Sequence, residues 1–257
     1  MIKPIINWFV NTKRSFQKYY GIFRADRLYR LGRYDDALRL NEWAYTICEA
    51  QDDIIYMARC DQKEGEICSS LGQYDKALTL LELSRDTFSK HNSTYYLAIS
   101  DIILSLLYIK LERYEEAFEL TNSALEVLRN LEMETKVDLK ADIAVGVLNL
   151  GIIYSNLGEL ETASKYIVSS GEFFYQQIFG KVNVAICDFN MALISYHRGE
   201  YNQAVNLYQT AKKVFLKKGM LDKIIACDLN SAGACLLLEK YDEALNLFQL
   251  AKKRYLE

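Results

Sequence analysis

LGRYDDAL, at residues 31–38, returns along the chain at a nearly constant interval. The related stretches are LGQYDKAL (71–78), LERYEEAF (111–118), LGELETAS (157–164), RGEYNQAV (198–205) and LEKYDEAL (238–245). The fourth residue of each stretch, called the anchor below, is Tyr34, Tyr74, Tyr114, Leu160, Tyr201 or Tyr241, and successive anchors are 40, 40, 46, 41 and 40 residues apart. A fixed period of about 20–50 residues is typical of arrays built from one repeated supersecondary unit.

Three positions around every anchor carry a small side chain. They lie nine residues before it (Ala25, Gly65, Ser105, Gly151, Ala192, Ala232), three after it (Ala37, Ala77, Ala117, Ala163, Ala204, Ala244) and ten after it (Ala44, Ser84, Ala124, Ser170, Ala211, Ala251). Two helices approach to about 8 Å only where the facing side chains are short. The pattern therefore predicts two closely packed helices per repeat, helix A before the anchor and helix B from the anchor onward.

This arrangement resembles the tetratricopeptide repeat family, over about residues 19–257. The resemblance implies an all-α fold, a right-handed superhelix (α-solenoid) of six helix-turn-helix repeats whose A helices line a concave groove. Two features depart from the family, because the period here is about 40 residues instead of 34 and the proline near the end of each repeat is absent, Pro4 being the only proline.

We place the repeats at about 19–50, 51–92, 93–134, 135–179, 180–219 and 220–257, after a basic amphipathic N-terminal extension, 1–18, continuous with the first helix. Helix A should end near a glycine with a left-handed backbone (Gly32, Gly72, Gly158 or Gly199). Glu112 and Glu239 replace that glycine in the third and sixth repeats, where we expect strained or differently shaped turns. Helix B should run about 16 residues, and the longer third interval, within 128–143, should lengthen helix B of the third repeat or helix A of the fourth.

Composition restricts the environment and the function class. Six cysteines lie in apolar helical runs without a C-x-x-C pair, which indicates reduced core residues of a cytoplasmic protein. The net charge of −3 does not favour nucleic acid as a partner. The only histidines, His91 and His197, lie in different repeats, and no catalytic, nucleotide-binding or metal motif is present. We therefore expect no enzyme activity, no cofactor and no metal site.

Asparagines recur at one A-helix position in the last three repeats. Asn149, Asn190 and Asn230 stand eleven residues before their anchors, where the first three repeats carry Phe23, Lys63 and Ile103. In some proteins of the resembled family an asparagine at this position clamps a peptide backbone, and an amide suits this role because it both donates and accepts. The alternative is that these amides form hydrogen bonds within the array.

The A helices also carry apolar residues expected near the groove from the third repeat onward: Ile102, Leu106, Leu148, Ile152, Phe189 and Leu193. They either form a hydrophobic half-groove for an apolar or helical ligand or are buried against the next repeat. Acids stand thirteen residues before four anchors (Asp61, Asp101, Asp188 and Asp228), and we expect them to accept hydrogen bonds between repeats.

The first and last repeats each have an apolar surface that no further repeat covers. The N-terminal extension could lie on an anionic membrane surface or cover the apolar flank of the first repeat, and we favour the cap. No polar helix follows the last repeat, so Leu245, Leu247 and Phe248 should be partly exposed and could support a homo-oligomer.

These features together predict a non-enzymatic scaffold or adaptor that binds a protein or peptide in the concave groove. The alternative is a regulatory or sensor repeat domain of a larger signalling protein, or a peptide-responsive regulator.

Overall fold

The computed structural model describes residues 17, 19–177 and 180–256, and these residues form helices and turns without a β-strand. A helix over 19–30 comes first. The others are α2 (Tyr34–Glu49), α3 (Ile54–Ser70), α4 (Tyr74–Lys90), α5 (Thr94–Lys110), α6 (Tyr114–Thr135), α7 (Lys140–Asn156), α8 (Leu160–Tyr175), α9 (Lys181–His197), α10 (Tyr201–Lys218), α11 (Leu221–Leu237) and α12 (Tyr241–Leu256). The chain is an all-α repeat solenoid, as the sequence predicts.

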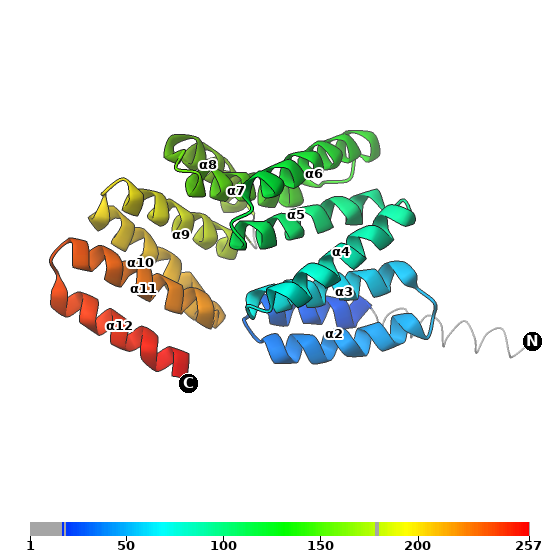
Figure 1. Cartoon of the computed structure of the whole chain (residues 1–257), viewed down its shortest axis with the longest axis horizontal. Coiled ribbons are helices and arrows are strands. Elements are labelled where there is room, and N and C mark those ends of the chain that lie inside the picture. The colour runs from blue at the N-terminus through cyan, green and yellow to red at the C-terminus, as the bar shows by residue number, and fades with distance from the viewer. Residues whose placement is uncertain (1–16, 18, 178–179, 257) are drawn as a thin grey trace, which may run out of the picture. The chain divides into compact units, whose positions relative to one another are not determined.

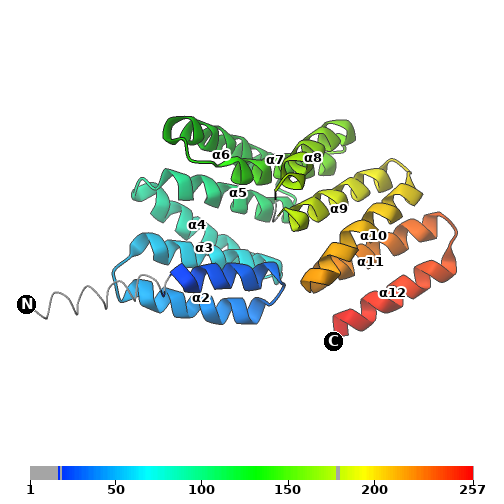
Figure 2. The same cartoon turned by 180° about the vertical axis from the view of Figure 1, so that it is seen from behind.

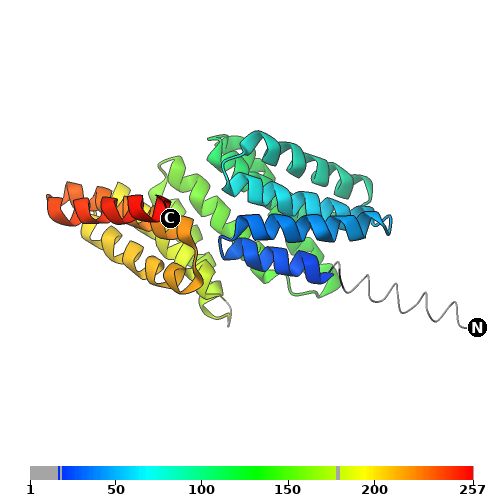
Figure 3. The same ribbon diagram turned by 90° about the horizontal axis from the view of Figure 1, so that it is seen from below.

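The chain divides into two compact units, an N-terminal unit (Met1–Leu107) and a C-terminal unit (Tyr108–Glu257). In the N-terminal unit, α3 packs against α4 and against α2 (Figure 2). In the C-terminal unit each helix from α6 to α12 packs against the next, and α9 to α12 run as successive antiparallel pairs (Figure 1, yellow to red). Figure 3 shows α11 and α12 side by side.

The small residues lie where the helices touch. All eighteen are buried. A methyl group added to Gly65 would lie 2.8 Å from Cγ of Leu81, and one added to Gly151 would lie 2.6 Å from Cγ1 of Ile167. Neither distance is tolerable for carbon atoms, so the close packing of helix A on helix B requires these short side chains, as predicted.

The turns after helix A share one conformation. The glycines at this position, such as Gly72 (φ +75°), have the predicted left-handed backbone. Glu112 (φ 60°) and Glu239 (φ 59°) adopt it too, at the strain expected of residues with a Cβ. The turn shape is nevertheless unchanged: the Arg113 amide donates to the Tyr108 carbonyl at 2.9 Å, and the Gln73 amide donates to the Cys68 carbonyl at the same distance.

The longer third interval extends helix B. α6 has 22 residues, whereas the other helices that start at an anchor have 16 to 18, and α7 has 17. α6 ends at Thr135, and Lys136, which caps it, has a left-handed backbone. Beyond it Leu139 is buried, and its amide donates to the Glu132 carboxylate at 3.2 Å. The extension and its return loop therefore pack against their own helix.

All six cysteines are buried free thiols, consistent with the core role inferred from the sequence. Burial raises the pKa of Cys187 to about 11 and that of Cys227 to about 12. These thiols are protonated at neutral pH and are poor nucleophiles.

Two sequence predictions concern the ends of the chain. The N-terminal extension lies outside the described residues except for position 17. Near the C-terminus, Leu245 and Phe248 are exposed and Leu247 is half-buried, as expected. No described helix combines the length and the apolar character that a membrane span requires.

Candidate functional site

A pocket of about 360 Å³ lies on the A-helix surface of the C-terminal unit. It is lined by Ile152, Ser155 and Asn156 of α7, Gly158 and Leu160 of the following turn and α8, and Asn190, Leu193 and His197 of α9. Three residues that the sequence singled out, Ile152, Asn190 and Leu193, therefore meet in one place.

The pocket is framed by equivalent positions of two consecutive A helices. Ile152 and Leu193 both stand eight residues before their anchors, and Asn156 and His197 both stand four before them. The sequence analysis overlooked Asn156 and His197. Their shared register was the available signal, because equivalent residues of adjacent repeats line the same surface.

The asparagines at the predicted ladder position have different environments. Asn149 is only 1% exposed and Asn190 is 8% exposed, whereas Asn230 is half-buried. Asn190 Nδ2 donates to the Ile186 carbonyl at 2.8 Å and Asn230 Nδ2 donates to the Ala226 carbonyl at 2.9 Å, each within its own helix. Among the described residues, neither side-chain oxygen has a partner, so each remains available as an acceptor.

The predicted apolar residues do not form one surface. Ile102 and Leu106 belong to the N-terminal unit, and the other four belong to the C-terminal unit. Ile102 and Leu148 are buried in the core, and Phe189 meets the ring of Tyr208 edge-on at 5.3 Å. Of the six, Ile152 and Leu193 line the pocket.

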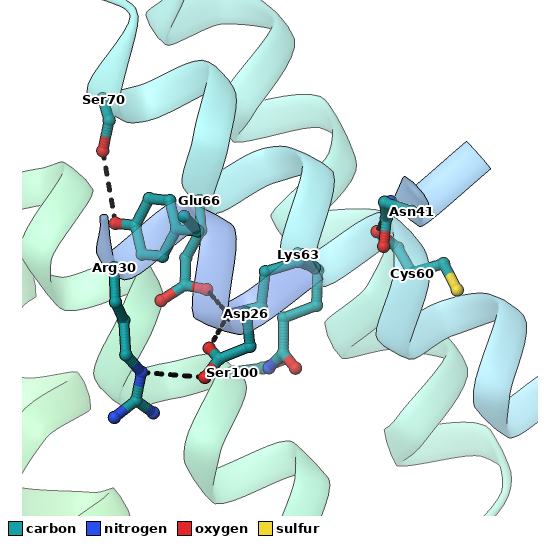
Figure 4. Close-up of polar contacts among 10 residues, drawn as sticks. Asp26, Arg30, Asn41, Cys60, Lys63, Glu66, Ser70 and Ser100 are labelled. Atoms are coloured by element: carbon teal, nitrogen blue, oxygen red, sulfur yellow. Dashed lines mark hydrogen bonds and ion pairs between the residues drawn. The ribbon is translucent and has the colours of Figure 1, made fainter. Parts of the chain in front are cut away.

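In the N-terminal unit the same register carries a charged network (Figure 4). Lys63, equivalent to Asn190, lies with its Nζ 2.8 Å from Asp26 and also contacts Glu66, and Asp26 pairs with Arg30 at 2.8 Å. Burial alone would raise the pKa of Asp26, but Lys63 and Arg30 outweigh it and lower the pKa. Likewise burial would lower the pKa of Lys63, but Glu66 and Asp26 raise it. These four charges neutralise one another.

Neutral hydrogen bonds accompany this network and connect successive A helices. Gln62 Nε2 donates to Ser100 Oγ at 2.8 Å, and the hydroxyls of Tyr29 and Ser70 lie 3.2 Å apart. On α2, Asn41 Nδ2 donates to the Cys60 carbonyl at 2.9 Å (Figure 4). The polar groups of this surface are thus used within the unit.

The recurring aspartates divide into two pairs. Asp228, fully excluded from solvent, binds Lys212 of α10 and Arg254 of α12, and Asp101 binds Arg85 of α4, so both connect repeats as predicted. In the described part of the chain, Asp61 and Asp188 have no cationic partner.

No cation in the described residues lowers the pKa of either unpaired aspartate. Burial, and then Glu64, raise the pKa of Asp61 to about 6, and burial raises that of Asp188. Charge at these two positions is therefore poorly compensated within the protein.

Both histidines are exposed, His91 after α4 and His197 at the end of α9. No set of three His, Cys, Asp or Glu side chains in the described residues is placed to hold a metal ion. The pocket presents the amide, hydroxyl and imidazole groups of Asn156, Asn190, Ser155 and His197 together with the apolar side chains of Ile152, Leu160 and Leu193.

No family model matches the chain. Two kinesin light chain-related proteins of Arabidopsis thaliana are similar in sequence. Protein KINESIN LIGHT CHAIN-RELATED 2 is 21% identical over 190 residues, which cover 73% of this chain and 28% of the relative. Protein KINESIN LIGHT CHAIN-RELATED 3 is 23% identical over 171 residues, which cover 66% of this chain and 24% of the relative. The chain thus spans about a quarter of the length of these relatives.

Three solved structures share the fold. A Rap protein complexed with competence and sporulation factor has a TM-score of 0.71 at 18% identity, covering 93% of this chain and 75% of that one. NprR in complex with its cognate peptide NprX has a TM-score of 0.69 at 18% identity, covering 97% and 77%. BtubC of P. vanneervenii has a TM-score of 0.58 at 16% identity, covering 89% and 91%.

The sequence relatives, the structural likenesses and the small-residue contacts agree with one another. They show that this chain has the fold of tetratricopeptide-type repeat proteins.

Proposed function

We propose that this chain is a non-enzymatic protein-interaction module that binds a peptide segment on the A-helix surface of its C-terminal unit. The observation that carries the proposal is the pocket in which Asn190 lies beside Ile152, Leu193 and His197. Its volume of about 360 Å³ suits one or two side chains of a ligand.

Asn190 would hold the peptide backbone while the apolar residues accept a side chain. Its oxygen can accept a backbone N–H, and an amide recognises any peptide unit irrespective of sequence. Asn230, one repeat further, offers the same group. Asn149 is buried, so its participation in a ladder requires a movement of its surroundings.

The structural likenesses favour a peptide over a folded domain as the ligand. Two of the similar structures were determined with a peptide or signalling factor bound, namely NprR with NprX and Rap with competence and sporulation factor. The same likeness supports the alternative of a peptide-responsive regulatory domain. We also retain as proposals a cytoplasmic location and self-association through the exposed residues of α12.

Selection of a random peptide library against the purified chain tests the site. Peptides selected by the wild type should bind at least about tenfold more weakly to N190A/L193A, because the variant removes one hydrogen bond and one apolar contact. N206A, on the exposed face of α10, is the matched control and should bind like the wild type. A ladder further predicts that N230A weakens binding.

Circular dichroism must show that all variants keep the helical content of the wild type. Selected peptides that bind N190A/L193A as tightly as they bind the wild type would exclude this pocket as the site.

A further inference from the structure

The contact between helix B of one repeat and helix A of the next is called a joint here, and two of the five joints contain an ion pair at the same two positions. The residue eleven positions after one anchor meets the residue thirteen before the next, as Arg85 meets Asp101 and Lys212 meets Asp228. At the first such joint Tyr45 takes the place of the cation, and the charge of Asp61 contributes to raising the tyrosine pKa after burial, its largest cause. At the third joint the two positions are Leu125 and Val147, which are both apolar.

The fourth joint, between α8 and α9, has the aspartate of this pair but lacks the cation. Asp188 occupies the acidic position, but position 171 is a glycine. A methyl group added to Gly171 would lie 3.5 Å from Cβ and 3.8 Å from Sγ of Cys187, which are ordinary contacts. At this joint the position equivalent to Arg85 and Lys212 therefore carries no side chain, and a Cβ there would make no clash.

Asp188 remains half-buried without a compensating charge. In the described part of the chain no lysine or arginine pairs with it, and burial raises its pKa. The cations at the equivalent positions reach solvent, since Arg85 is 44% exposed and Lys212 is 18% exposed. The equivalent position at the fourth joint is consequently accessible to a cation from outside the protein.

We propose that Asp188 and the vacant side-chain position at Gly171 form a cation seat that receives a lysine or arginine side chain of a partner protein. Charge complementarity identifies this occupant, because the protein fills the same place with its own arginine or lysine at two other joints. A guanidinium group fits a carboxylate through two parallel hydrogen bonds, so arginine is the better occupant.

The cation seat is separate from the pocket. Asp188 and Asn190 are two residues apart on α9, and such residues point to different faces of a helix. The seat therefore adds a second contact for a basic partner and does not depend on the peptide site proposed above.

N-acetyl-arginine amide is the probe, and its neutral isostere N-acetyl-citrulline amide is the matched control. The chain has only 12 glycines, so labelling glycine with ¹⁵N gives a sparse NMR spectrum in which the Gly171 amide can be followed. The arginine probe should shift this signal saturably and bind at least about fivefold more tightly than the citrulline probe, because only arginine carries a charge.

Two variants should abolish the response for different reasons. D188N removes the carboxylate, and G171K supplies an internal cation at the position equivalent to Lys212. Because G171K lacks the Gly171 signal, binding to this variant is followed on the arginine probe itself by saturation-transfer difference NMR, with the wild type measured in the same way. D75N, an exposed acid on α4, and N190A/L193A should leave the response unchanged. Equal shifts with both probes, a wild-type Gly171 shift in D188N, or wild-type saturation transfer to the arginine probe in G171K would overturn the proposal.

Discussion

At the joint between α10 and α11, Asp228 pairs with Lys212 and Arg254 and is excluded from solvent. At the joint between α8 and α9 the position equivalent to Lys212 is Gly171, and the equivalent Asp188 has no cationic partner in the described residues. The helices of both joints have the same register. The side chain at one position thus decides whether a joint is closed by an internal ion pair or left open to a ligand.

The A-helix surface shows a related difference between the two units. Lys63 in the N-terminal unit and Asn190 in the C-terminal unit occupy the same repeat position. Lys63 is held by Asp26 and Glu66, whereas Asn190 lines a pocket with an unpartnered oxygen. Equivalent repeat positions thus hold an internally paired charge in one unit and a pocket-lining amide in the other.

The largest expected effect comes from D228N, compared with D188N. Removing the Asp228 charge leaves Lys212 and Arg254 uncompensated and should lower the free energy of unfolding by about 3 kcal/mol. D188N should not lower it, because Asp188 has no ion pair and its burial already favours the neutral form. Urea unfolding followed by circular dichroism measures both, and equal losses in the two variants would show that the joints do not differ.

A smaller effect separates two glycines. G151A places a methyl group 2.6 Å from Ile167 Cγ1 and 3.3 Å from the Ala163 carbonyl, and should destabilise the protein by about 2 kcal/mol through overpacking. G171A meets only ordinary contacts and should be neutral or stabilising by up to about 1 kcal/mol, because alanine favours the helix. Thermal unfolding of both variants tests this. A destabilised G171A would show that a side chain does not fit at position 171 of the α8–α9 joint.

The smallest effect concerns Asp61, the other unpaired aspartate. Its pKa, about 6 in the folded protein against an ordinary 3.8, means that the folded state favours the protonated acid. The resulting stabilisation is complete below about pH 4 and is lost as the pH rises through about 6. At pH 7 the free energy of unfolding of D61N should therefore exceed that of the wild type by about 1 kcal/mol, and its urea midpoint should be higher. The difference should vanish near pH 4.

Urea midpoints of D61N and the wild type across pH 4–8 provide the measurement. D75N, at an exposed acid, is the control and should follow the wild-type curve. Parallel curves for D61N and the wild type would mean that Asp61 is solvated normally.

The sequence alone determined the helices, their turns and the contacts within each repeat. Small residues, left-handed glycines and anchors recur at a fixed spacing, and these features act over one or two helical turns or across one hairpin. Local steric requirements can therefore be predicted from the sequence. Even Glu112 and Glu239 adopt the left-handed turn conformation of the other repeats.

Only the tertiary structure decided which repeated residues are accessible. It buried Asn149, Ile102 and Leu148, brought Ile152 and Leu193 into one pocket, and extended α6 instead of α7. It also paired Asp228 with Lys212, 16 residues away, and Arg254, 26 residues away, and left Asp188 without a cationic partner among the described residues. The physical reason is that burial and charge pairing depend on side chains contributed by neighbouring helices, so equivalent residues of a repeat have different environments.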